Sequence, residues 1–298
     1  MNPKFIKTHA DLQTKQQDIC DGFLAQVLRK TKKAKDYIEE AKIFEKKLKE
    51  SDTLENILAS PECQKDLASA CGFSEKAKAK LNKTVLDDTI KEVIPQICKD
   101  AGAESMEEIR KEILFRCLLT KGDTMGGSMR NSIGASAGTR LTKKITERLS
   151  HCGKEFKVSE SKSGKIQKVV FNNRVLLFDK KSPVIDKNID VILMENSEGK
   201  SIRDLIHDKK KYIACGELKG GIDPAGADEH WKTGGSAIDR IRNAFKKNTP
   251  KLFFVGAAIE ASMAREILKQ LKNGKLNHAA NLNKEEQVID LVDWLLSL

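Results

Sequence analysis

The sequence predicts a helical N-terminal half followed by an α/β half with a mixed sheet. Apolar residues recur at helical spacing through about residue 150, and β-rich runs appear only after that point. These runs alternate with further helical patterns, as expected when helices cover a sheet. We therefore expect a mainly helical domain over residues 1–120 and a sheet-containing domain over residues 121–298.

Helix-starting and helix-ending residues support the first half of this prediction. Over residues 10–50, apolar side chains recur among Lys and Glu at the spacing of an amphipathic helix. A second helix is expected to start at Ser60 as its cap and to stop at Gly72. Ser105 followed by Glu108 matches a capping box, so another helix should begin there.

The second half shows strand patterns separated by turn residues and helices. Asn172-Asn173 divides two β-rich runs and predicts a hairpin with a two-residue turn. Three more strands are expected in the segments NIDVILME, YIACGELK and KLFFVGAAIE. Helical patterns occupy residues 229–247, 260–273 and 283–298, which favours an α/β core.

Composition excludes several classes of protein. No apolar run approaches the roughly 18–20 residues that cross a bilayer. The first residues also lack an apolar export signal, so we expect a cytoplasmic protein with no membrane partner. The seven cysteines are scattered without a CxxC pair, which indicates reduced thiols rather than disulfides or structural zinc.

The charge balance favours a polyanionic partner. The formal net charge is +11 and the pI is about 9.2, both typical of proteins that bind nucleic acid but also of well-solvated lysine-rich chains. Aromatic residues make up only 5%, fewer than a base-stacking single-strand binder needs. If the partner is nucleic acid, double-stranded DNA fits better.

Two acids and a lysine in neighbouring strand candidates indicate a catalytic site. Asp190 lies in one strand, and Glu217 and Lys219 lie near the end of the next. Residues i and i+2 of a strand share a face, so Glu217 and Lys219 should point together, and Asp190 joins them if the strands pair. Such carboxylates bind Mg²⁺ in enzymes that cut phosphodiesters, and the Asp…Glu-x-Lys pattern is typical of the restriction-nuclease-like fold. The alternative is ordinary surface charge at a strand end.

The glycine-rich segment that follows this strand contains neither a P-loop nor a GxGxxG motif. It predicts a tight loop that leads into a helix, with His230 in the first turn. That imidazole either packs or faces solvent, or it helps to deprotonate a water molecule.

Several segments together resemble one enzyme family. GELKGGIDPAGADEHWKT, GDTMGGSMRN, KNID, LFFVGAAIEASMAREI and LNHAANLNKEEQV are similar to segments of the AvaI/BsoBI family of type II restriction endonucleases. The similarity extends over nearly the whole chain. It implies a PD-(D/E)XK core with a mixed sheet, an N-terminal helical domain that embraces DNA, and a homodimer that encloses the duplex.

The resemblance also implies roles for individual residues. The expected catalytic residues are Asp190, Glu217, Lys219 and His230, and the expected contacts to Mg²⁺ are Asp190, Glu217 and Leu218. The expected DNA contacts are Lys76, Lys187, Asp223, Glu229 and Arg130. Alternatively, Lys76 is simply a solvated surface lysine. The Gly126-Gly127 pair near Arg130 either lets the backbone approach DNA or allows a helix to pack closely, and we favour close packing.

The family resemblance implies a target and a partner enzyme. The target is the palindrome CYCGRG, cut after the first C, with a cognate DNA methyltransferase acting on the same site without a stable complex. Residues 151–186 diverge from the family pattern, so outer-base contacts can differ. Three alternatives stay open: a structure-selective repair nuclease of the same fold, a non-catalytic DNA-binding relative, and a hydrolase of small phosphoesters, which the basic charge disfavours.

Overall fold

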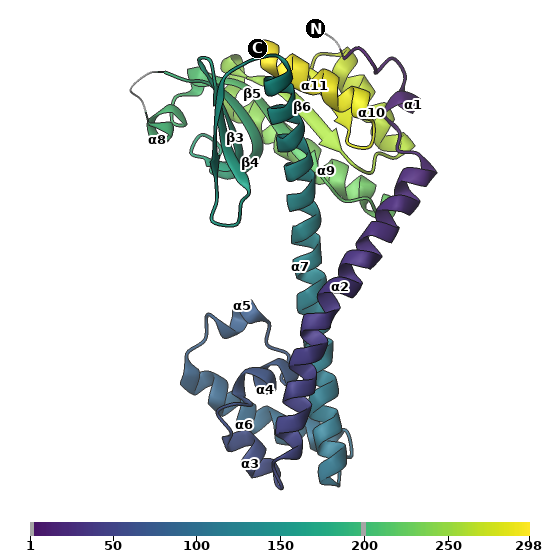
Figure 1. Cartoon of the computed structure of the whole chain (residues 1–298), viewed down its shortest axis with the longest axis vertical. Helices are drawn as coiled ribbons and strands as arrows, with labels where there is room; N and C mark the ends of the chain where they lie inside the picture. The colour runs from purple at the N-terminus through teal and green to yellow at the C-terminus, as the bar shows by residue number, and fades with distance from the viewer. Residues whose placement is uncertain (1–2, 198–200) are drawn as a thin grey trace. The chain divides into compact units, whose positions relative to one another are not determined.

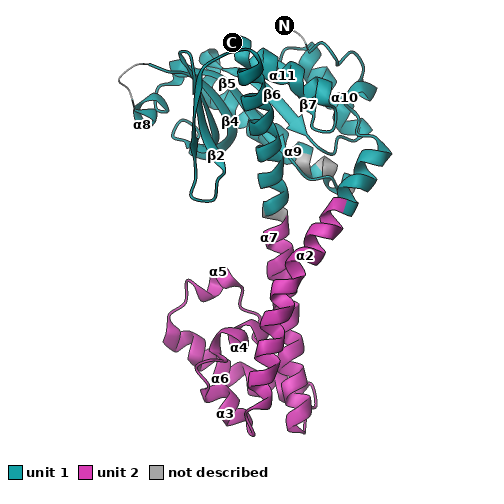
Figure 2. Cartoon of the chain, in the orientation of Figure 1, with its two compact units in different colours: residues 1–24, 132–298 teal, residues 25–131 magenta. Residues whose placement is uncertain are grey.

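The chain forms two compact units in a computed structural model that describes residues 3–197 and 201–298, except the side chains of 130, 131, 225, 227, 228 and 230. One unit contains residues 1–24 and 132–298, and the other contains residues 25–131 (Figure 2). The predicted boundary at residue 120 therefore differs from this division, because the first residues join the sheet and residues 121–131 join the helical unit.

The secondary structure consists of helices followed by a sheet with further helices (Figure 1). The α-helices are α1 His9–Leu12, α2 Gln16–Lys49, α3 Leu54–Ala59, α4 Gln64–Ala70, α5 Glu75–Lys78, α6 Lys83–Asp100, α7 Met106–His151, α8 Ile202–Leu205, α9 Ala227–Phe245, α10 Ala261–Lys272 and α11 Glu285–Ser297. The 3₁₀ turns are η1 Lys209–Lys211, η2 Pro224–Gly226 and η3 Lys246–Asn248. The strands are β1 Phe156–Glu160, β2 Ile166–Phe171, β3 Arg174–Ser182, β4 Lys187–Glu195, β5 Tyr212–Lys219, β6 Lys251–Gly256 and β7 His278–Asn281.

The seven strands form one mixed sheet in chain order, which confirms the predicted fold class. Strands β1 to β5 pair antiparallel in succession, and β6 and β7 add in parallel. The predicted hairpin joins β2 to β3, with Phe171 opposite Arg174 and Asn172 at a φ of 46°. The sequence patterns missed β1, whose residues are mostly exposed, and β7, which has only four residues.

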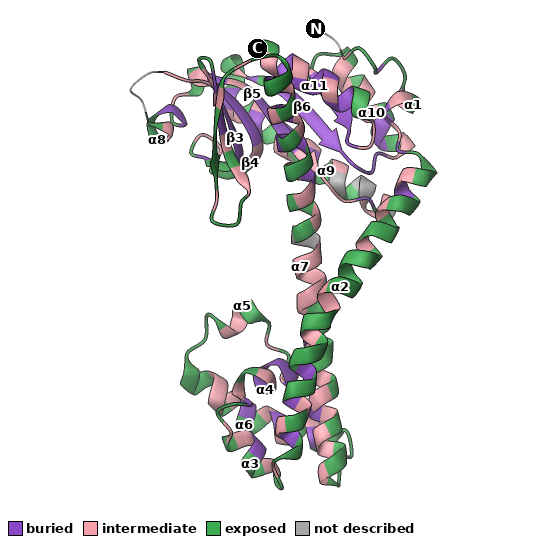
Figure 3. Cartoon of the chain, in the orientation of Figure 1, coloured by how far each residue is buried: buried purple, intermediate pink, exposed green. Residues whose placement is uncertain are grey.

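Both faces of the sheet are buried, and each has its own hydrophobic core. Strand residues alternate between the two cores, as the pleat requires: Val175 and Leu177 of β3 face one, and Leu176 and Phe178 face the other. Helices α9 and α10 cover the first face, and the C-terminal part of α7 and helix α11 cover the second (Figure 3). The sheet is therefore a rigid platform for residues at its strand ends.

Hydrogen bonds hold the first residues of the chain to the sheet unit. The Thr14 hydroxyl donates to the Ala257 carbonyl over 2.9 Å, and the Thr14 amide donates to the Ile259 carbonyl over 3.0 Å. The buried Asn281 amide group donates to Thr14 Oγ1 and to the Leu12 carbonyl, each over 2.8 Å. These bonds explain why the first segment of the chain, which contains α1 and the start of α2, belongs with the sheet unit.

The helical unit has a separate core from α2, α3, α4, α6 and α7, with Phe44, Ile57 and Ile94 fully buried. The predicted capping box is confirmed, since Ser105 and Glu108 exchange side-chain-to-backbone hydrogen bonds before α7. The prediction for Ser60 was wrong. Ser60 ends α3, and a turn intervenes before α4, whereas Gly72 follows α4 at a φ of 92° as predicted.

A buried lysine links α7 to α2 and α4 in the helical unit. Lys121 is 7% exposed, and its amine donates to Glu40 over 2.7 Å and lies 3.0 Å from Asp66. Burial alone would lower the pKa of Lys121, but the hydrogen bonds to the two carboxylates outweigh it and raise that pKa. The amine therefore stays charged.

We expect Lys121→Ala to lower the free energy of unfolding of the helical unit by about 3 kcal/mol, because the substitution leaves Asp66 without its cation. Urea denaturation followed by circular dichroism measures this change. The control Lys111→Ala removes an exposed lysine of the same helix, paired with Glu107, and should cost less than about 1 kcal/mol. Equal losses for the two variants would contradict the prediction.

Candidate active site

The register of β4 and β5 sets Asp190 against Glu217. Val191 pairs with Gly216 in this antiparallel ladder, so the next positions along the two strands are Asp190 and Glu217. Directly opposite residues in such a pair have Cβ atoms about 5 Å apart. The predicted adjacency of the two strands is therefore correct, and it places the two carboxylates side by side.

Unusual backbone positions lie next to this pair on β5 and on β3. Gly216 is tightly packed, because an added Cβ would lie 2.1 Å from the ring of Phe253 on β6. On the other side of β4, Asp179 interrupts the β3 ladder opposite Asp190, with a φ of 49°. Irregular strand positions of this kind often lie beside active sites, where they redirect a side chain.

Hydrogen bonds fix the orientation of both carboxylates. The Leu218 amide donates to Asp190 Oδ2 over 2.8 Å. The Lys219 amine donates to Glu217 Oε1 over 2.6 Å, as their shared strand face predicts. Glu217 is only 7% exposed, whereas Asp190 and Lys219 are partly exposed. The structure thus brings the three predicted residues together, while their catalytic role stays a prediction.

The two acids share one nearby lysine, and their pKa values reflect this shortage of positive charge. Burial and the charge of Asp190 raise the pKa of Glu217 to about 7, although Lys219 opposes the shift. Burial also raises the pKa of Asp190, against the hydrogen bond from Leu218 and the charge of Lys219. A cation bound between the carboxylates would relieve this repulsion.

The donor set fits a hard divalent cation with an incomplete protein shell. Within the described residues, no donor contacts the second oxygen of Asp190 or of Glu217. No group of three or more His, Cys, Asp or Glu side chains surrounds one point in that part of the chain. Mg²⁺ commonly binds one or two carboxylates and completes its shell with water and phosphate oxygens, which suits this pair. Leu218 could contribute only through its main-chain carbonyl.

Helix α9 packs against the end of β5 through the turn that contains Trp231 and Gly234, directly after its first turn. Gly234 of α9 lies where an added Cβ would be 2.7 Å from the ring of Phe254 and 3.6 Å from Cε of Lys219. The edge-to-face contact between Trp231 and Phe254, with ring centroids 5.3 Å apart, fixes the same turn. His230 belongs to this first turn, but its side chain lies outside the described residues, as does that of Arg130.

The remaining predicted DNA contacts lie in different places. Lys187 is exposed at the start of β4, Asp223 is exposed in the loop after β5, and Glu229 is exposed in the first turn of α9. Lys76 lies in α5 of the helical unit and lines a cavity of about 510 Å³ with residues of α7. The structure therefore places three of these residues around the sheet site and one in the other unit.

From the sequence we favour close helix packing at the Gly126-Gly127 pair. The surroundings of Gly126 do not support this interpretation. Among the described residues, no atom lies within 4 Å of a Cβ added at this position. Gly127 lines the cavity that contains Lys76. Gly126 is therefore not a site of close packing among the described residues, and both glycines are half-buried.

Sequence analysis missed charged residues that act on the site, and Arg240 is one of them. The positive charge of Arg240, five residues before the end of α9, lowers the pKa of Glu217. No motif marks this arginine, because it is one of many basic residues on an amphipathic helix. The only available signal was its helical spacing from Glu229 and Ser236, which places the three on one stripe.

This combination of fold and site defines a class of protein. A mixed sheet that carries two acids and a lysine on adjacent strands is the arrangement of a restriction-endonuclease-like nuclease. The sequence model of the family described as "Restriction endonuclease BsobI" matches residues 3–171 and 166–298. The chain belongs to the BsobI restriction endonuclease family, and as such it is an enzyme that hydrolyses DNA.

Individual relatives match over almost their full length. The type II restriction enzyme AvaI of Nostoc sp. is 36% identical over 313 residues, which cover 98% of this chain and 98% of the relative. The type II restriction enzyme BsoBI of Geobacillus stearothermophilus is 36% identical over 317 residues, which cover 98% of this chain and 97% of the relative. These matches confirm the family resemblance seen in the sequence.

We expect Glu217→Gln to stabilise the metal-free protein at pH 8 more than at pH 5.5. The ordinary pKa of glutamate is 4.5 and that of folded Glu217 is about 7, so the unfolded chain loses this proton first. The folded wild-type protein therefore becomes less stable as the pH rises from about 4.5 through about 7. Glutamine carries no such proton, so the Glu217→Gln variant does not lose this stability. The gain at pH 8 should be on the order of 1–3 kcal/mol by urea denaturation in EDTA.

Glu195→Gln is the matched control for this measurement. Glu195 ends β4 and pairs with Lys211 over 2.8 Å at a more exposed position. Its substitution should give no gain at pH 8. A gain for Glu217→Gln that is the same at both pH values, or a loss at pH 8, would contradict the prediction.

Proposed function

We propose that this enzyme is a Mg²⁺-dependent type II restriction endonuclease that cuts double-stranded DNA at CYCGRG after the first C. The observation that carries the proposal is the meeting of Asp190, Glu217 and Lys219 at the paired ends of β4 and β5. The similarity to AvaI and BsoBI supports the type of enzyme and, through the family resemblance, the target.

Asp190, Glu217 and the Leu218 carbonyl would hold the metal ion. When bound, Mg²⁺ neutralises charge on the scissile phosphate and lowers the pKa of a bound water. The two carboxylates are already fixed by Leu218 and Lys219, so little reorganisation is needed for binding. Their raised pKa values mean that the site gives up protons as it takes up the ion.

The other residues of the site would act on water and phosphate. Lys219 can turn its amine from Glu217 toward the attacking water or a phosphate oxygen, where positive charge stabilises the transition state. His230, in the first turn of α9, would accept the proton of that water. The water oxygen bonds to phosphorus as the bond to the 3′ oxygen breaks, and that oxygen takes up a proton. The products carry 5′-phosphate and 3′-hydroxyl ends.

Basic and polar residues around the site would bind the duplex. Lysine contacts to phosphates give affinity that depends on salt, and contacts to base edges give selectivity. The net charge of +11 supports such binding. Lys187, Asp223 and Glu229 lie near enough in the chain to the catalytic residues to contact the target. Lys76 and Arg130 would reach DNA from the helical unit.

A homodimer would match the two-fold symmetry of a palindromic target, with one active site for each strand. Exposed apolar side chains support a protein partner for the long helices. On α2 these are Phe23, Leu24, Val27 and Leu28, and on α7 they are Phe115, Leu118 and Leu119. Contiguous exposed apolar residues of this kind commonly mark an interface. A methyltransferase that modifies the same DNA sequence would protect the host without a stable complex.

Digestion of a fully sequenced viral DNA with Mg²⁺ tests the activity, target and cut position together. We expect discrete fragments whose sequenced ends all begin with YCGRG after a cut that follows the first C. Discrete ends at another palindrome would correct the target alone. Cleavage confined to forks or junctions would favour a repair nuclease, and no cleavage would favour a non-catalytic relative.

We expect Asp190→Asn and Glu217→Gln to lower the cleavage rate by about 10³-fold or more, since each removes a negative charge from the metal site. Duplex binding, measured by fluorescence anisotropy without metal, should survive. Glu195→Gln, at the other end of β4, should cleave like the wild type. Metal-dependent cleavage at wild-type rates by both site variants would refute the assignment.

A further inference from the structure

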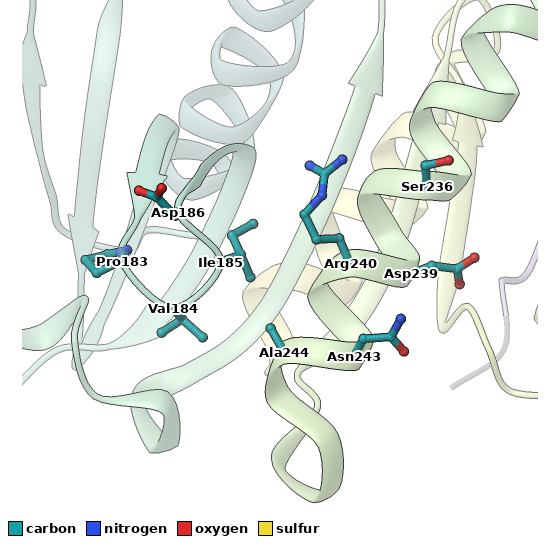
Figure 4. Close-up of a pocket in the computed structure, with 9 residues that line it drawn as sticks. All are labelled: Pro183, Val184, Ile185, Asp186, Ser236, Asp239, Arg240, Asn243 and Ala244. Atoms are coloured by element: carbon teal, nitrogen blue, oxygen red, sulfur yellow. The ribbon is translucent and has the colours of Figure 1, made fainter.

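An open groove lies beside the catalytic strands in the sheet unit. Its volume is about 780 Å³, and the turn between β3 and β4 and the second half of α9 form its walls (Figure 4). The lining residues are Pro183, Val184, Ile185 and Asp186 on the turn and Ser236, Asp239, Arg240, Asn243 and Ala244 on the helix. The turn leads directly into β4, which carries Asp190.

The acidic residues of this groove are neutralised by cations other than Arg240. Asp186 pairs with Lys181 over 2.6 Å. Asp239 pairs with Arg242, which also donates to the Lys275 carbonyl over 2.8 Å. Figure 4 shows Arg240 on the side of α9 that faces the turn, and Asp239 on the opposite side.

Arg240 is therefore an exposed guanidinium with no carboxylate of its own. Within the described part of the chain, no hydrogen bond or ion pair engages its side chain. An arginine that faces an open groove without a partner is suited to an anion such as a phosphate, two oxygens of which can accept parallel hydrogen bonds from the planar guanidinium. Lys187, exposed where the turn becomes β4, adds a second positive charge at the edge.

One stripe of α9 runs from the start of the helix, beyond β5, to this groove. Glu229, Ser236 and Arg240 follow one another at intervals of seven and four residues, so they lie on one stripe of the helix. Gly234, on the same helix six residues before Arg240, lies where an added Cβ would be 3.6 Å from Cε of Lys219. A DNA strand whose scissile phosphate lay at Asp190 and Glu217 could place a neighbouring phosphate in this groove.

We propose that Arg240 binds a backbone phosphate adjacent to the scissile one, in the groove between the 183–186 turn and α9, and so positions the strand for cleavage. The proposal rests on the proposed function, because it needs duplex DNA at the strand ends. It makes Arg240 a positioning residue, whose contact with a phosphate is independent of the base sequence.

The test compares Arg240→Gln with Arg242→Gln, which removes the same charge two positions away. The probe is a fluorescein-labelled duplex that carries the target site found by fragment-end sequencing. Its binding is measured by fluorescence anisotropy in Ca²⁺ at a series of KCl concentrations. Loss of one phosphate contact lowers the slope of log K against log [KCl] by about 0.9, hence by about 1.8 for a two-fold dimer. We expect Arg240→Gln to show this loss and bind about 10-fold more weakly at 0.1 M KCl. Arg242→Gln should keep the wild-type slope.

A methylphosphonate scan then identifies the contact. Neutral methylphosphonate replaces one phosphate at a time in the duplex, and each change is measured with the wild type, Arg240→Gln and Arg240→Lys. At the phosphate that Arg240 binds, the change should weaken the wild type but cause no further loss in Arg240→Gln. Arg240→Lys should recover most of the slope, because it keeps the charge.

Two results would overturn the proposal. One is an Arg240→Gln variant whose binding depends on salt as steeply as that of the wild type. The other is a methylphosphonate scan in which, at every phosphate flanking the cut, the substitution weakens Arg240→Gln as much as it weakens the wild type. A wild-type protein that neither binds nor cuts the duplex would instead count against the proposed function. Circular dichroism of each variant checks folding, which a surface substitution on α9 should leave intact.

Discussion

The repulsion between the buried carboxylate of Glu217 and the half-buried carboxylate of Asp190 is the constraint on which the rest of the site depends. The β4–β5 register forces Asp190 and Glu217 together, and one lysine is too little positive charge for both. The folded chain therefore carries an unfavourable interaction that a bound divalent cation would relieve. Functional sites commonly retain such costs, because the same groups that repel each other bind a ligand with little rearrangement.

Packing on both faces of the sheet makes this arrangement possible. Gly216 lets the ring of Phe253 lie directly against β5, and Gly234 lets α9 approach Lys219 and Phe254. These close contacts fix the end of β5 against its neighbours, so that the carboxylates cannot move apart to relieve their repulsion. Buried cores above and below the sheet supply the free energy that holds the pair in place.

In the proposed function, helix α9 would link the catalytic residues to the binding of DNA. Its buried stripe, with Ile238 and Ile241, anchors it on the sheet, while its exposed stripe runs from Glu229 to Arg240 beside an open groove. A rigid helix that is fixed to the catalytic strand can hold a phosphate-binding group at a constant distance from the metal site. In the proposed function, this geometry would let Arg240, distant in sequence from Asp190, influence the position of the scissile bond.

The sequence by itself determined the features that depend on neighbouring residues. Glu217 and Lys219 share a face because strand side chains alternate, the Asn172-Asn173 turn closes a hairpin, and Ser105 with Glu108 starts α7. The tertiary structure was needed to show that residues 1–24 join the sheet unit and that Arg240 of α9 faces the turn before β4. These features rest on contacts between segments far apart in the chain, which periodicity and spacing do not encode.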